Sequence, residues 1–206
     1  AAPLVRPLTL DLAGQGYALC IVDTGADHAD LTDEYAAIPA EMKAVATACG
    51  GQVLRDVPKE TFFQNLPALR RSLGDRALLR AFHFYADDER AALQANALEN
   101  GEFDRFLQLV NESGVSNFTL LQNVFCRSKP AEEQPVALAL ALAGTLLEGR
   151  GVCRVHGGGF AGTIQAYVPL DFVGQFKAGM EALLGEGMCH VVSIRPVGGL
   201  HLTENN

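Results

Sequence analysis

This sequence of 206 residues contains no tryptophan, and aromatic residues make up only 7% of it. Its five cysteines are dispersed singly, which gives no disulfide framework and favours reduced thiols in a cytoplasmic compartment. Basic residues are scarce as well, because 16 Lys and Arg stand against 24 Asp and Glu and leave a net charge of −8. Such a charge gives no electrostatic support for binding nucleic acid or an anionic membrane, so neither partner is expected.

Long apolar runs are also missing. The longest, residues 136–147, is too short to cross a bilayer and is interrupted by Gly144. The chain nevertheless has 49% hydrophobic and 19% charged residues, a composition typical of folded domains and not of disordered chains. No internal repeat or low-complexity tract divides it. We therefore expect residues 1–206 to form a single domain with a substantial core.

Hydrophobic periodicity predicts an α+β fold. Strands are expected at 8–12, at 17–22, on either side of a glycine-rich loop at 157–162, and at 188–195. Helices are expected at 30–49, 75–100, 102–111, 134–148 and 171–184, with a short helical turn at 61–66. Asp30 and Asp75 are the expected caps, Pro39 should kink or divide the first helix, and 126–135 should be a flexible loop. Helices separate the first main strand from the others, so an antiparallel sheet with helices on one face is the natural arrangement.

The glycine-rich loop spells G-x-G-x-x-G through Gly157, Gly159 and Gly162. In a dinucleotide-binding fold, such a loop is followed by a helix whose N-terminus holds the pyrophosphate. Here the loop is followed by residues 163–168, which have the composition of a strand and end at Pro169. We therefore do not interpret this loop as a dinucleotide site.

Two groups of side chains suggest metal ligands, and both have a simpler explanation. The first is an acidic cluster around one loop: Asp23, Asp27, His28, Asp30, Asp33 and Glu34. Carboxylates of this kind suit Mg²⁺, but helix capping and the helix dipole account for most of them. The second group, Cys153 and His156, is three residues apart on a strand, so the two side chains should face opposite sides. No metal site is predicted.

The residues from Arg154 to Gly162 (R-V-H-G-G-G-F-A-G) resemble the third motif of the galactokinase branch of the GHMP kinases, typically R-M-T-G-G-G-F-G-G. The chain departs from that motif at three positions. Val155 and His156 replace Met and Thr, and Ala161 replaces a glycine. These changes leave the fold assignment intact but weaken any expectation of the usual substrate preference.

Two further blocks resemble the same family. Residues 18–35 match its strand, loop and helix with a D/S-x-E-Y-like element, and residues 80–112 match its long helix and the next helix, which ends in Glu-Ser. Residues 114–147 match poorly. The resemblance identifies the C-terminal half of a galactokinase, or of a galactokinase-like paralogue, with a ferredoxin-like antiparallel sheet. It also implies that the nucleotide-binding half and the catalytic Asp lie upstream, since no Gly/Ser-rich nucleotide loop occurs here.

The resemblance implies a function for the parent chain. This is transfer of the γ-phosphate of ATP, with Mg²⁺, to the anomeric hydroxyl of galactose or a related sugar. Partners are then the sugar, ATP and the N-terminal half, while this chain alone should be inactive, bind no cofactor tightly and self-associate through its exposed inter-domain face. The alternatives are a non-catalytic sugar-binding or regulatory module, and another GHMP kinase with a different small-molecule alcohol as substrate.

The resemblance also implies the site residues, with no catalytic residue in this chain. Tyr35 corresponds to a tyrosine near the sugar, although its place on the apolar stripe of its helix suits core packing equally well. The loop near the nucleotide phosphates consists of Gly157, Gly158, Gly159, Phe160 and Gly162. These glycines are expected to provide close backbone approach and not acid–base chemistry.

Overall fold

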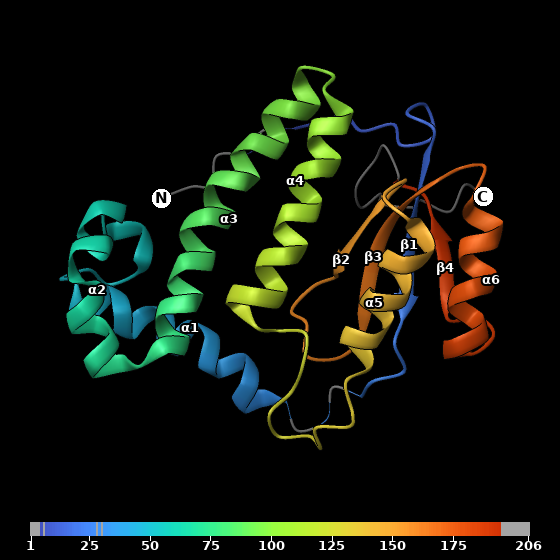
Figure 1. Ribbon diagram of the computed structural model, residues 1–206. Coiled ribbons are helices and arrows are strands. Elements are labelled where there is room, and N and C mark those ends of the chain that lie inside the picture. The colour runs from blue at the N-terminus through green and yellow to red at the C-terminus, as the bar shows by residue number, and fades with distance from the viewer. Residues whose placement is uncertain (1–4, 6, 28, 30, 195–206) are drawn as a thin grey trace, which may run out of the picture.

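The protein is described by a computed structural model that covers residues 5, 7–27, 29 and 31–194. Its centre is a four-stranded sheet in the order β2-β3-β1-β4, with every neighbouring pair antiparallel. The strands are β1 (Tyr17–Asp23), β2 (Val152–Val155), β3 (Thr163–Pro169) and β4 (Cys189–Val192). With helices between β1 and β2 and between β3 and β4, this is the ferredoxin-like topology that the family resemblance implies (Figure 1).

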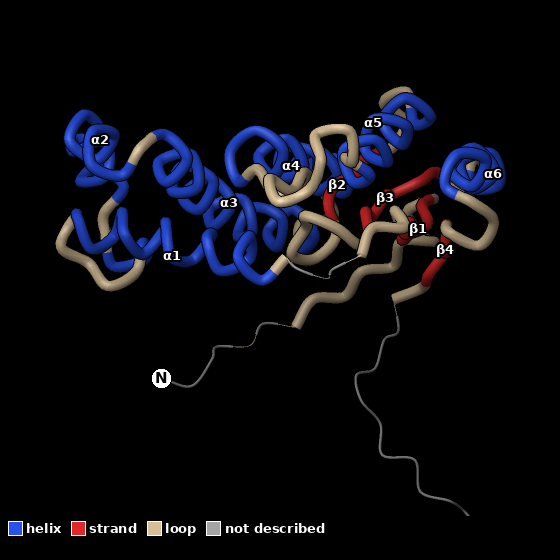
Figure 2. Tube along the Cα trace, turned by 90° about the horizontal axis from the view of Figure 1, so that it is seen from below, coloured by secondary structure: helices blue, strands red, loops and turns tan. Residues whose placement is uncertain are grey.

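Two helices, α5 (Pro135–Leu147) and α6 (Val173–Leu184), cover one face of the sheet (Figure 2). Alternation along β1 directs Cys20 and Val22 toward these helices. They pack there with side chains from β3, α5 and α6 in the main core, which includes Ile164, Ala166, Val168, Val136, Ala139, Ala143, Phe176 and Met180. Burial of this cluster holds the sheet and the two helices together.

The other helices extend away from the β2 edge of the sheet (Figure 1). They are α1 (Thr32–Ala48), α2 (Lys59–Leu73), α3 (Asp75–Glu99) and α4 (Phe103–Ser116). Helix α4 lies against β2, while α1, α2 and α3 enclose a second apolar cluster that includes Val45, Phe62 and Ala81. A short 3₁₀ turn, Leu54–Asp56, connects α1 to α2. No helix among the described residues meets the length and hydropathy expected of a membrane span.

The predicted strand at 8–12 is wrong. Residues 7–11 have no regular secondary structure, and a turn in which the Tyr17 N–H donates to the Leu12 carbonyl leads into β1. A strand at 8–12 would need a place beside β1, but β3 and β4 already occupy both of its edges. Leu12 is instead buried against the side chains of α4.

Three helix predictions also need correction. The short turn expected at 61–66 is the middle of a 15-residue helix, α2, whose buried Phe62 and Leu69 fix it against its neighbours. Helix α1 continues past Pro39 and is not divided there, and its expected cap, Asp30, lies outside the described residues. Helix α4 runs beyond residue 111 and is followed by a π-helical turn, η2 (Asn117–Leu121).

Candidate functional site

The glycine-rich loop joins β2 to β3 as a tight connection, and its backbone explains its composition. Gly157, Gly159 and Gly162 have φ angles of 71°, 79° and 79°, in the left-handed region that only glycine adopts freely. Phe160 also lies there, with φ of 62°. A bulky residue in this conformation is strained and needs its surroundings to hold it.

Two neighbouring glycines are required by close packing. A Cβ atom at Gly158 would lie 2.7 Å from Cε1 of Tyr35, and one at Gly159 would lie 2.2 Å from the carbonyl oxygen of Asn123. Both separations are too short for any side chain. The loop therefore lies directly against α1 and against the segment that follows η2.

Three residues from different parts of the chain hold the loop by hydrogen bonds. The Tyr35 hydroxyl donates to the Gly159 carbonyl at 2.7 Å, and the Asn123 side-chain amide donates to the Gly158 carbonyl at 3.0 Å. Thr24, just after β1, donates to the Gly162 carbonyl from both its N–H (2.9 Å) and its Oγ1 (2.7 Å). The loop is thus preorganised by α1, by β1 and by the end of η2.

The structure brings Tyr35 and the glycine loop together, although the sequence placed them 124 residues apart. The Tyr35 ring also packs edge-on against Phe160, with 5.3 Å between ring centroids. Desolvation by burial raises the pKa of the Tyr35 phenol, so it remains a hydrogen-bond donor near neutral pH. The contacts of Tyr35 with Gly159 and Phe160 agree with a packing role for this residue. Contact between Tyr35 and a sugar stays a prediction.

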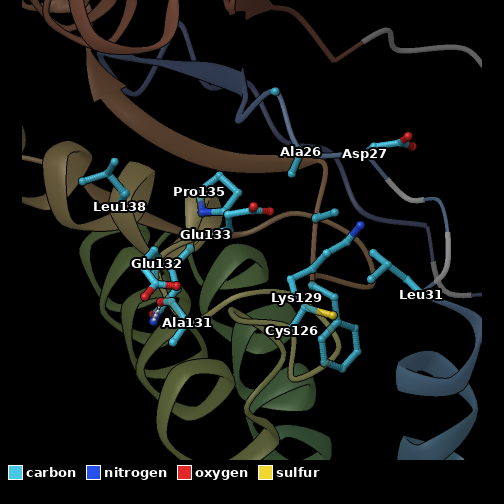
Figure 3. Close-up of a pocket in the computed structure, with 15 residues that line it drawn as sticks. Ala26, Asp27, Leu31, Cys126, Lys129, Ala131, Glu132, Glu133, Pro135 and Leu138 are labelled. Atoms are coloured by element: carbon cyan, nitrogen blue, oxygen red, sulfur yellow. Dashed lines mark hydrogen bonds between the residues drawn. The ribbon is translucent and has the colours of Figure 1, made fainter.

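A cavity of about 680 Å³ opens beside the glycine loop (Figure 3). Phe160 and Ala161 form one wall, and the segment after β1, including Ala26 and Leu31, forms another. The remaining lining comes from the segment that precedes α5 and from the start of α5 itself, including Cys126, Lys129, Ala131, Glu132, Glu133, Pro135 and Leu138. Its volume is in the range of small-molecule sites, and its walls combine apolar side chains with a few charged ones.

The sequence did not indicate this cavity wall, because residues 114–147 carry no recognisable motif. Ala161 lines the cavity at the position where the family motif has a glycine, so its methyl group changes the shape of the wall. The other two altered positions lie outside the cavity. Val155 is buried in the main core, and His156 has its Nδ1 2.9 Å from Oε1 of Gln165. Of the three departures, the one at Ala161 alone changes the cavity wall.

Glu34 has a structural role that its place in the first helical turn did not suggest. It is only 5% exposed, and its Oε1 accepts a hydrogen bond from the Arg127 N–H at 3.0 Å. The same oxygen lies 3.6 Å from Nε of Arg127 and 4.0 Å from Sγ of Cys126. Glu34 thus attaches the helix that carries Tyr35 to the segment that lines the cavity.

Of the acidic cluster around 23–34, His28 and Asp30 lie outside the described residues, and among the described residues no group of three potential metal ligands is found. Asp23 accepts a hydrogen bond from the Gly25 N–H at 2.8 Å, and Asp27 accepts one from the Ala29 N–H at 2.9 Å. Both are local turn contacts of the kind that Asp side chains make in loops.

Comparison with known proteins finds both structures and sequences that are similar to this chain. No protein-family model matches the chain. Among solved structures, the galactokinase of Lactococcus lactis in complex with galactose matches 85% of this chain and 45% of that chain, with a TM-score of 0.64 and 23% sequence identity. The ferredoxin-like domain described here therefore shares its fold with the matched part of this galactokinase.

Sequence comparison finds similarity to galactokinases as well. The galactokinase of Glaesserella parasuis serovar 5 (strain SH0165) is 30% identical over 159 residues, which are 77% of this chain and 39% of that protein. The galactokinase of Streptomyces lividans is 32% identical over 160 residues, 77% of this chain and 37% of that protein. The chain is thus a homologue of galactokinases, and it spans less than half the length of these relatives.

Proposed function

We propose that these residues form the C-terminal half of an ATP-dependent sugar kinase that phosphorylates the anomeric hydroxyl of galactose or a close relative. The observation that carries the proposal is the Tyr35–glycine loop contact, in which two motifs shared with galactokinases meet beside a cavity of small-molecule size. We also propose a cytoplasmic location, and the five unpaired cysteines are compatible with such a reducing compartment.

This chain would contribute positioning and not acid–base chemistry. Phosphoryl transfer depends mainly on alignment of the reactants and stabilisation of charge. The clamped loop offers a rigid backbone surface that approaches closely because four of its positions are glycines without side chains. Tyr35 would orient the sugar, while ATP and Mg²⁺ would be held by the N-terminal half that the resemblance implies.

The test is a galactose-dependent ADP-release assay on the complete polypeptide encoded by the reading frame that contains these residues. We expect turnover with galactose or a related sugar, and none from the 206-residue chain alone. Turnover by this chain alone would contradict the proposal that it only positions the reactants and that the N-terminal half holds ATP and Mg²⁺. A complete polypeptide that neither binds a sugar nor releases ADP would overturn the proposed function.

The alternative of a non-catalytic sugar-binding module has one specific observation in its favour. Ala161 adds a methyl group to the cavity wall at a position where the related motif has glycine. Sugar binding by isothermal titration without ADP release would favour this alternative. The substitution Ala161→Gly restores the motif glycine and separates the two functions. A kinase whose turnover is limited by this methyl group should gain activity, whereas a non-catalytic module should not.

A further inference from the structure

Asn123 is the least expected member of the site. It is 2% exposed, and like Thr24 it holds the glycine loop from both its side chain and its backbone. Its side-chain Nδ2 donates to the Gly158 carbonyl at 3.0 Å, and its own carbonyl accepts the Phe160 N–H at 2.5 Å. These two bonds bracket Gly159, where a Cβ atom would lie 2.2 Å from the Asn123 carbonyl oxygen.

The other polar atom of the Asn123 carboxamide, its oxygen, has no partner among the described residues. Its Oδ1 is buried and accepts no hydrogen bond there. The Gly158 carbonyl fixes the amide orientation, because a flipped side chain would set two oxygens against each other. A buried acceptor without a donor destabilises a fold, so an apolar residue of the same shape would be the more stable choice.

Asn123 is itself held firmly by the segment that contains it. The π-helical turn η2 ends with the Gln122 N–H donating to the Asn117 carbonyl at 2.8 Å, and Gln122 takes a left-handed φ of 58° that redirects the chain. On the far side, Val124 is buried in the main core. Such π-helical turns occur frequently at functional sites, where they re-aim one residue.

We propose that Asn123 is a positioning residue that sets the conformation of the glycine loop, and that its half-paired carboxamide is retained for this purpose at a cost in stability. Through the Gly158 and Phe160 contacts, it keeps Phe160 in the left-handed conformation and fixes the wall that Phe160 and Ala161 present to the cavity. The effect of Asn123 on catalysis rests on the proposed function, whereas its effect on the loop does not.

Two variants of nearly the same shape isolate the carboxamide. Asn123→Leu removes the donor together with the unpaired acceptor, and Asn123→Asp places an acceptor against the Gly158 carbonyl. The matched control is Thr119→Ala in the same π-helical turn, because Thr119 bonds only the local Val115 carbonyl, at 2.7 Å, and does not reach the loop.

The first measurement needs no activity. In hydrogen–deuterium exchange on the 206-residue chain, we expect the backbone amides of the glycine loop, that of Phe160 included, to exchange about fivefold faster in Asn123→Leu than in the wild type, as for the loss of one hydrogen bond. The increase should be larger in Asn123→Asp and absent in Thr119→Ala. Loop exchange within twofold of the wild type in both Asn123 variants would overturn the proposal.

The second measurement uses the complete polypeptide. We expect Asn123→Leu to lower kcat about tenfold while the KM for the sugar changes less than about threefold, since a shifted loop misaligns the reaction more than it weakens binding. Its unfolding midpoint should equal or exceed that of the wild type, because the unpaired oxygen is gone. If kcat decreases only in proportion to the fraction of folded protein, Asn123 is a purely structural residue and its effect on catalysis is rejected. If the wild type itself shows no turnover, the proposed function fails and the exchange data still decide the role of Asn123.

Discussion

Gly159 is subject to two separate constraints, and both forbid a side chain. Its φ of 79° costs an L-residue about 1–2 kcal/mol, and a Cβ would lie 2.2 Å from the Asn123 carbonyl oxygen. We expect Gly159→Ala to lower the free energy of unfolding by about 2–4 kcal/mol, measured by urea denaturation. The control is Gly144→Ala in α5, where nothing lies within 4 Å and the φ is ordinary, so a gain of about 0.5–1 kcal/mol is expected. Equal effects of the two changes would contradict this account of the loop.

Tyr35 can be tested for packing and for substrate contact with one substitution. Tyr35→Phe removes the hydrogen bond to the Gly159 carbonyl and keeps the ring contact with Phe160. We expect a loss of about 1 kcal/mol in unfolding free energy, together with at least a fivefold increase in the sugar KM of the complete polypeptide. An unchanged sugar KM at the same loss of stability would leave Tyr35 a packing residue and reject its role in substrate binding.

The sequence predicted the parts of this site but not how they are joined. Tyr35 and the glycines could be found because each lies in a short motif that resembles a known family. Asn123 could not, because its partner Gly158 is 35 residues away and no local pattern marks it. The same holds for Glu34, whose ordinary position in a first helical turn concealed a buried contact to Arg127.

At the scale of elements, the α3–α4 interface contains a buried polar network that sequence periodicity did not show. His83 of α3 is 7% exposed, with Nδ1 2.9 Å from Ser116 Oγ of α4 and Nε2 3.7 Å from Asp87 Oδ2. Asp87 in turn accepts from Ser113 at 2.8 Å, which attaches the two helices a second time. The pKa of His83 is lowered mainly by desolvation, with Arg90 and Arg154 acting in the same direction and Asp87 opposing them.

This network predicts a pH dependence of stability with a definite sign. Because the folded pKa of His83 lies below its ordinary value of 6.5, the unfolded chain binds more protons in the interval between the two values. The contribution of His83 to the unfolding free energy is therefore complete above about pH 6.5 and is lost as the pH falls through the folded pKa. We expect His83→Gln to reduce the loss of stability between about pH 7 and pH 5 in urea denaturation. Parallel pH profiles for the two proteins would show that His83 is not the group responsible.

Element predictions failed where tertiary contacts override local pattern. The alternating leucines at 8, 10 and 12 read as a strand, but both edges of β1 are occupied by β3 and β4. Helix α2 is longer than its periodicity suggested because Phe62 and Leu69 anchor it to α1 and α3. The elements nearest the sheet, α5 and α6, were predicted to within two residues because their apolar faces pack directly on the core.

At the scale of the whole molecule, α5 and α6 cover one face of the sheet, α4 covers part of the other face, and the β4 edge carries exposed apolar side chains. Val191, Val192 and Ile194 on and after β4 are 49%, 38% and 52% exposed. Register pairs Val192 with Leu19, so Val192 lies on the face opposite α5 and α6. Edge strands with apolar side chains are sites of association unless something covers them.

This edge gives a physical basis for the self-association expected of the isolated chain. We predict that the 206-residue chain forms dimers or larger species as its concentration rises, measured by sedimentation velocity, and that Val192→Lys shifts it toward monomer. Leu183→Lys is the matched control. Leu183 is 52% exposed on α6, so this substitution adds the same charge outside β4. Equal effects of the two lysines would mean that net charge, not the edge, controls association. A wild-type chain that stays monomeric at every concentration would contradict the expected self-association and show that the β4 edge needs no cover.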